Sequence, residues 1–279
     1  DYLGALTLFL CLLAYLSGLT LGQSAGFSDL RVLGLFARGA LLLGLFIVVE
    51  KRAAQPMSDL TLFRNLEFST SLVTGYLTFV AVAGALILMP FYLENVLGYS
   101  TRQVGLLIAV LPISMGVIAP IAGSLSDRLG TRIITVAGLV ILLIGYAVLS
   151  TLSAQTTALT FVLLLLPIGV GMGIFQSPNN STIMGAASPD KLGIVSGMLA
   201  LNRTLGQTTG IAVMGAVWAA LTLYFAGPAA ISNAAGAAAP AQVAALQYTF
   251  IVMAAVILVA LLLAIGSLIK APPRRSPAD

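Results

Sequence analysis

Eight long apolar runs constrain this sequence more than any other feature. They fall at residues 2–22, 32–50, 68–93, 104–122, 133–152, 158–178, 194–224 and 247–269. A helix needs about 20 apolar residues to cross the roughly 30 Å hydrocarbon core of a bilayer, and helices satisfy their own backbone hydrogen bonds in lipid. The ten-residue alternation of outer-membrane strands is absent from the sequence. We therefore predict an all-α integral membrane protein with eight transmembrane helices.

The composition supports this fold class and excludes several kinds of site. The chain is 59% hydrophobic and only 8% charged, whereas soluble domains carry about 25% charged residues, so the lipid bilayer is an expected partner. The net charge of +4 fits the surplus of Lys and Arg in cytoplasmic loops, and we predict no nucleic-acid partner. With no histidine and one cysteine, Cys11, the chain offers no Cys/His metal site and no intrachain disulfide. We assign no catalytic residue, no metal and no cofactor.

The distribution of basic residues predicts the orientation. If the polar segment 123–132 faces the cytoplasm, nine basic residues lie on that side: Lys51, Arg52, Arg64, Arg128, Arg132, Lys191, Lys270, Arg274 and Arg275. Three lie on the other side: Arg31, Arg38 and Arg102. Cytoplasmic loops of membrane proteins are enriched in Lys and Arg, so both ends of the chain are expected in the cytoplasm.

Four regions follow from the order of the runs. We expect two central transmembrane helices within 1–50, a cytoplasmic linker at 51–67, a six-helix unit at 68–270 and a basic cytoplasmic tail at 271–279. The linker is either a short helix on the membrane surface or a plain solvated connection. Because the sequence opens on Asp1 without a basic stretch before its first apolar run, we expect it to be the interior of a longer polypeptide.

The six-helix unit carries a trace of internal duplication. Three residues recur at a constant offset of 88 positions, in the pairs Pro90 and Pro178, Ser100 and Ser188, and Gly105 and Gly193. Each serine opens a helix, and Gln103 three residues after Ser100 predicts a capping box. An offset of three spans places the two copies on opposite sides of the membrane, which indicates an inverted 3+3 repeat.

The polar segment 123–132 reads G-x-L-S-D-R-x-G-x-R and joins two apolar runs. Gly123 allows two helices to approach closely, and Gly130 permits the left-handed backbone of a tight turn. Asp127 suits the positive N-terminus of a neighbouring helix, and Arg128 and Arg132 suit a phosphate-rich membrane surface. The alternative is an ordinary cytoplasmic turn built from small and charged residues.

Polar residues inside the later spans are candidates for a cavity or for coupling. Arg203 is the one charge well inside a predicted span, which makes it a functional candidate, or alternatively a brace near the inner interface. The other candidates line a cavity or join helices by hydrogen bonds: Gln176, Asn180, Asn202, Gln207 and Tyr76. Gly206 and Gly210, spaced four apart, predict close helix packing.

At these residues the sequence resembles the major facilitator superfamily, whose signature loop recurs between the second and third helices of each six-helix half. The stretches 111–123, 169–180, 193–197 and 202–210 resemble one branch of it, the fourteen-span drug/proton antiporters. The resemblance implies a central helix pair followed by a C-terminal half. It implies part of a secondary active transporter in a bacterial cytoplasmic membrane, driven by a proton gradient and exporting drugs or other small amphipathic compounds by alternating access.

The same resemblance implies a partner that this sequence lacks, an N-terminal six-helix half that supplies the proton-coupling acid. Here Glu50 and Glu67 fall at inner ends of spans and Glu94 at an outer end, so we expect no deeply buried carboxylate. We also expect Asp127 to meet no helix N-terminus from another half within this chain. Two other classes stay open: a membrane-embedded enzyme such as a lipid-processing transferase, and a non-transport membrane subunit or channel.

Overall fold

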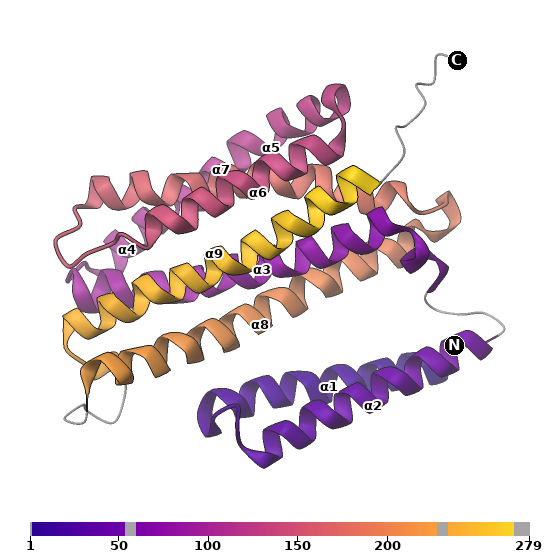
Figure 1. Ribbon diagram of the computed structural model, residues 1–279, viewed down its shortest axis with the longest axis horizontal. Coiled ribbons are helices and arrows are strands. Elements are labelled where there is room, and N and C mark those ends of the chain that lie inside the picture. Colours follow the sequence, from indigo (N-terminus) through magenta and orange to yellow (C-terminus); the bar gives the residue numbers. More distant parts are fainter. Residues whose placement is uncertain (1, 54–59, 228–233, 271–279) are drawn as a thin grey trace.

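The computed structural model describes residues 2–53, 60–227 and 234–270. These residues are almost entirely helical and contain no strand. Eight of their helical segments are long and apolar enough to cross a membrane. The predicted all-α membrane fold is therefore confirmed (Figure 1).

The first two helices form an antiparallel pair, α1 (Tyr2–Ala25) and α2 (Leu30–Arg52). Gly39 lets the backbones of α1 and α2 approach closely. The Cys11 thiol of α1 donates a hydrogen bond to the Gly39 carbonyl oxygen of α2 at 3.3 Å. Asp29 caps α2 by accepting a hydrogen bond from the Arg31 amide at 2.8 Å. In Figure 1 the pair lies along one flank of the other helices, beside α8.

The remaining seven α-helices of the described residues form the six-helix unit, because the short α4 and α5 together make one span. They are α3 (Leu66–Phe91), α4 (Thr101–Ile108), α5 (Val110–Leu129), α6 (Thr131–Leu149), α7 (Ala158–Gly185), α8 (Leu192–Ala226) and α9 (Ala239–Lys270). A π-helical turn at Tyr92–Val96 extends α3, and short 3₁₀ turns lie at Leu60–Arg64, Pro189–Lys191 and Ala234–Gly236. Together α4 and α5 make one span, Thr101–Leu129.

Glycines allow the central helices of this unit to pack closely. A Cβ atom on Gly138 of α6 would lie 2.6 Å from the Phe175 backbone nitrogen of α7, and one on Gly171 would lie 2.8 Å from the Leu142 nitrogen. Small residues at helix interfaces allow helices to associate in membranes by close packing. Burial of apolar surface does not drive this association, because lipid tails are as apolar as the side chains. The core beside this contact is filled by fully buried aromatic rings, including that of Tyr146.

The two halves of the repeat run in opposite directions. The turn from α3 to α4 and the turn from α7 to α8 lie at opposite ends of the bundle in Figure 1. The capping box is present, since the Ser100 amide donates to Gln103 Oε1 at 2.9 Å. Ser188 likewise precedes the turn Pro189–Lys191. Both observations agree with an inverted 3+3 arrangement. We name the end of the bundle that carries Gly130 the signature end.

Several helix boundaries differ from those expected, and prolines account for two of the differences. The span expected at 104–122 is broken at Ala109 and continues to Leu129. Pro112 accounts for the break, because proline has no amide hydrogen to donate to the Ile108 carbonyl. The last helix begins at Ala239, eight residues before 247, and Pro240 fits there because the first helical turn tolerates proline.

The linker expected at 51–67 is partly helical. Helix α2 extends into it as far as Arg52, and the 3₁₀ turn Leu60–Arg64 precedes the start of α3 at Leu66. Residues 54–59, and the basic tail at 271–279, lie outside the described residues.

Candidate functional site

The signature segment, residues 123–132, is mostly helical. Helix α5 continues through Leu129, and α6 begins at Thr131. Gly130 alone makes the turn, with φ of 91° and ψ of 142°, a backbone region that is almost exclusive to glycine. The tight turn predicted at Gly130 is confirmed, and the polar residues before it belong to the end of α5.

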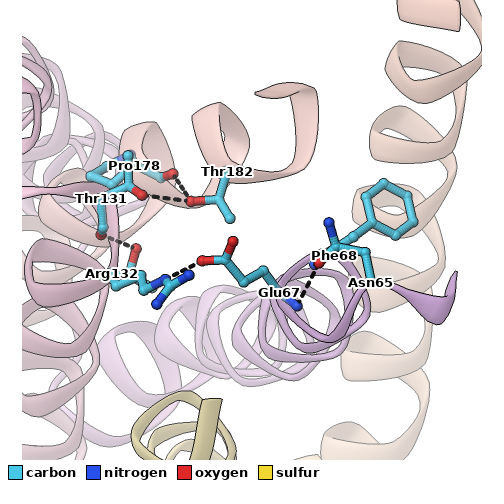
Figure 2. Close-up of polar contacts among 8 residues, drawn as sticks. Asn65, Glu67, Phe68, Thr131, Arg132, Pro178 and Thr182 are labelled. Atoms are coloured by element: carbon cyan, nitrogen blue, oxygen red, sulfur yellow. Dashed lines mark hydrogen bonds and ion pairs between the residues drawn. The ribbon is translucent and has the colours of Figure 1, made fainter. Parts of the chain in front are cut away.

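An ion pair ties the signature segment to the start of α3 (Figure 2). Arg132 Nε, in the first turn of α6, donates to Glu67 Oε1. Asn65 caps α3 and accepts a hydrogen bond from the Glu67 amide at 3.0 Å, which fixes the backbone that carries the acid. Both charged side chains are shielded, with 26% of Arg132 and 21% of Glu67 exposed. This contact couples two helices that the sequence separates by 65 positions.

A hydroxyl contact adds α7 to the same cluster. Thr182 donates to Thr131 Oγ1 at 2.9 Å and to the Pro178 carbonyl at 3.0 Å. Pro178 lies inside α7, which continues past it to Gly185. Three helices, α3, α6 and α7, are thus joined at the signature end (Figure 2).

The other three residues of the signature segment have different surroundings. A Cβ atom on Gly123 would lie 3.3 Å from Ser177 Oγ of α7, so Gly123 permits a close approach. Asp127 and Arg128 are exposed. Within the described residues, neither of these two side chains forms an ion pair or hydrogen bond. Both side chains are therefore free to contact another molecule or helix at the signature end.

A cavity of about 590 Å³ lies among α3, α4, α5, α7 and α8, within the size range of small-molecule sites. Its wall is mainly apolar, and it includes three of the predicted candidates, Arg203, Gln176 and Gln207. Glu94, on the π-helical turn, belongs to the same wall. An apolar surface with a few polar groups is typical of sites for amphipathic ligands.

Three other predicted residues lie away from this cavity. Tyr76 donates to Thr209 Oγ1 at 3.0 Å and contacts the Tyr15 hydroxyl at 3.1 Å. Asn202 donates from Nδ2 to the Leu72 carbonyl at 3.0 Å. Both line a separate pocket of about 310 Å³, and the half-buried Asn180 lines neither cavity. Tyr76 and Asn202 thus join helices by hydrogen bonds, which is the alternative that the sequence had left open for them.

Gly206 and Gly210 lie directly against α3. A Cβ atom on Gly206 would be 2.8 Å from Phe79 Cβ and 2.9 Å from the Tyr76 carbonyl oxygen. One on Gly210 would overlap the Val80 carbonyl oxygen. These contacts set how closely α8 can approach α3.

Some polar residues of these helices escaped prediction from the sequence. Asn179 is 2% exposed between the helices, and its Oδ1 has no hydrogen-bond partner among the residues described. The Tyr15 hydroxyl contacts Thr209 at 2.7 Å and so links α1 to α8. The expectation of no deeply buried carboxylate also fails, because Glu50 in the last turn of α2 is 3% exposed. Hydropathy patterns report that a residue is in a span, not which neighbour it faces.

No cluster of three or more metal-ligating side chains occurs among residues 2–53, 60–227 and 234–270. A ligand-sized, mainly apolar cavity and the tightly turned, charged segment share helix α5. This arrangement is suited to holding and releasing a small molecule between helices.

Comparison with known proteins identifies the class. The chain is 31% identical to the multidrug resistance protein Stp of Mycobacterium tuberculosis, over 79% of this chain and 41% of Stp. It is 28% identical to the multidrug transporter protein MdtP of Bacillus subtilis, over 78% of this chain and 40% of MdtP. It is 29% identical to the quinolone resistance protein NorB of Staphylococcus aureus, over 78% of this chain and 48% of NorB. The chain thus spans less than half the length of these relatives.

A family match covers most of the sequence. Residues 2–211 match the Major Facilitator Superfamily, so the family resemblance of the signature segment is confirmed. The helices that carry this match also form the wall of the cavity and the ion-paired turn. The chain belongs to the Major Facilitator Superfamily, a family of membrane transporters.

Proposed function

We propose that this chain forms part of a proton-coupled secondary transporter that exports drugs or other small amphipathic compounds by alternating access. The observation that carries the proposal is the 590 Å³ cavity, whose largely apolar wall holds a few polar groups. The names of the relatives Stp, MdtP and NorB point to drugs as substrates. We infer that the chain catalyses no chemical reaction and uses the proton gradient in place of a cofactor.

We further propose that an N-terminal six-helix half completes the cavity. Exposed apolar side chains of α5, such as Ile113, Val117 and Ile121, face away from the core of this unit. A second half packed against this side would cover them and would also meet the exposed Asp127. In that arrangement Asp127 would accept hydrogen bonds from a helix N-terminus of the other half, where the helix dipole favours an anion.

The signature end would then act as the inner gate. With this end in the cytoplasm of a bacterium, both ends of the chain are cytoplasmic, as the positive-inside rule requires. The Glu67–Arg132 pair would keep α3 and α6 together, so that the segment moves with its half as one body. Rocking of one half against the other would make and break the contact at Asp127.

Everted membrane vesicles test this proposal. Vesicles containing the complete product of the natural gene are energised with a proton gradient, and a fluorescent pH probe reports proton release when a fluoroquinolone is added. We expect substrate-dependent proton movement that an uncoupler abolishes and that Asp127→Asn reduces. Vesicles containing only residues 1–279 are the control and should show none. Proton release by these control vesicles would contradict the need for a second half, and no substrate-dependent release in any preparation would contradict the proposed antiport.

A further inference from the structure

We propose that Arg203 binds the anionic group of the substrate, so that the cavity selects amphipathic carboxylates over lipophilic cations. This inference rests on the proposed export function and specifies its substrate class. It depends on the depth of Arg203 in the membrane, on its free guanidinium and on the distance to the other charge in the cavity.

Arg203 lies at a depth where an unsatisfied charge is costly. It precedes Thr209, the midpoint of α8, by six residues. At 1.5 Å per residue this is about 9 Å from the centre of the helix, inside the roughly 15 Å half-thickness of the hydrocarbon core. Charged residues at such depth almost always face a cavity and take part in function. Arg203 does line the cavity.

The guanidinium has no anionic partner in the part of the chain that the structure describes. The Arg203 Cζ lies 5.9 Å from the centroid of the Phe79 ring, which is at the outer limit of a cation–π contact. The side chain is exposed to the cavity. Its hydrogen-bond donors are therefore available to a ligand, and guanidinium binds carboxylate through two parallel hydrogen bonds.

Glu94 is the other charged residue among those described on the cavity wall, and it is too distant to neutralise Arg203. Phe79 marks the level of Arg203 on α3, and Glu94 follows fifteen residues later, which corresponds to roughly 20 Å along the helix. At roughly 20 Å the attraction between two unit charges is only about 0.8 kcal/mol at an effective dielectric constant of about 20. The deep part of the cavity thus has a positive potential, which attracts an anion and repels a cation.

The residues around Arg203 fit the remainder of such a ligand. Gln176 and Gln207 offer amides, while Met115 and Met172 supply adaptable apolar surface for an aromatic ring. This combination predicts a compound with one carboxylate on a flat apolar body. The depth of the site disfavours a phospholipid, whose phosphate lies at the membrane surface.

The test measures binding of three tritiated probes that share a naphthalene ring. They are 1-naphthylacetate, its methyl ester, and a naphthylethyl-trimethylammonium cation. The complete gene product is held in phosphatidylcholine nanodiscs on scintillation beads, and empty nanodiscs give the background. We expect the carboxylate to bind about ten- to a hundredfold more tightly than the ester, as for a hydrogen-bonded charge, and the cation to bind most weakly.

Three variants assign the preference to Arg203. Arg203→Gln should reduce carboxylate affinity to that of the ester, whereas Arg203→Lys should retain part of the preference because it keeps the charge without the bidentate geometry. Arg102→Gln removes an exposed arginine that does not line the cavity and should leave all three affinities unchanged. Gel filtration and a thermal melt establish that each variant is folded.

The other outcomes would overturn the inference in distinguishable ways. Equal binding of all three probes would remove the carboxylate preference while leaving a drug-binding cavity, and tightest binding of the cation would reverse the substrate class. Displacement of naphthylacetate by added phosphatidylglycerol would assign the site to lipid headgroups. Failure of all three probes to bind would also remove the cavity on which the proposed function depends.

Discussion

The Glu67–Arg132 pair should contribute measurably to stability, since its surroundings differ from those of a surface ion pair. Exposed pairs contribute about 0.2–1 kcal/mol, and removing one partner of a buried pair costs about 3–5 kcal/mol. With 26% of Arg132 and 21% of Glu67 exposed, this pair lies between those limits. We expect Glu67→Gln or Arg132→Gln to destabilise the chain by about 1–2 kcal/mol.

A double-mutant cycle isolates the interaction from other effects of each substitution. We expect a coupling energy of about 1 kcal/mol between the two sites. Unfolding is followed in mixed micelles of dodecylmaltoside and dodecylsulfate by the fluorescence of Trp218, the one tryptophan of the chain, which is 8% exposed. Repeating the cycle in 1 M salt should reduce the coupling only partly, because shielded pairs are screened less than exposed ones.

The chain supplies a matched control in the pair Asp29 and Arg31. These residues are only two positions apart, and 72% of the Arg31 side chain is exposed. The same cycle there should give a coupling below about 0.5 kcal/mol. Equal coupling at both pairs, or a value near zero at Glu67–Arg132, would refute the idea that this ion pair joins α3 to α6.

Three further predictions use single substitutions. Gly130→Ala should destabilise the chain by about 1–3 kcal/mol, because the φ of 91° at this position disfavours a side chain. The control is Gly116→Ala, which should be near neutral in the same thermal melt because nothing lies within 4 Å of the added methyl group. Gly210→Ala should separate α8 from α3 and lower the thermal midpoint by several degrees, since the methyl group would overlap the Val80 backbone; an unchanged midpoint would contradict this packing. The Arg31 side chain lowers the pKa of Asp29 below its ordinary value of 3.8, so the cap on α2 is retained above that value and lost as pH falls through the lowered pKa. Hydrogen exchange at the Arg31 amide should show this acid transition, and Asp29→Asn should abolish it.

The overall fold was predictable from hydropathy alone because each apolar run matches one bilayer crossing. All eight predicted runs overlap a membrane-length helix. The ends of the helices were less predictable, because the effect of a proline on a helix depends on its position in that helix. Pro112 breaks a span near Ala109, whereas Pro240 is accommodated within the first turn of α9. The same residue type therefore ends one helix and lies at the start of another.

Polar contacts between distant segments were not predictable. The sequence shows Glu67 and Arg132 as charges near span ends, but nothing in either neighbourhood specifies that the two side chains meet. Their pairing depends on how α3 and α6 each pack against α7 and α9, which sequence periodicity does not determine. The burial of Asn179 was not predicted for a related reason. Its neighbour Asn180 has the same side chain but is only half-buried, so residue type alone does not show which of the two is buried.

Helical spacing accounts for the separation between cavity residues and packing residues on α8. Arg203 and Gln207 are four positions apart and share the face that lines the cavity. Gly206 and Gly210, also four apart, share the adjacent face against α3, because residues at i and i+4 lie on one side of a helix. Gln176 and Asn180 obey the same rule on α7, yet only Gln176 lines the cavity. Asn180 lies one turn, or about 5.4 Å along the axis, beyond Gln176. This position is nearer the signature end and beyond the end of the cavity. Periodicity thus assigns a residue to a face, while the depth of the cavity along the helix decides whether that residue can contact a ligand.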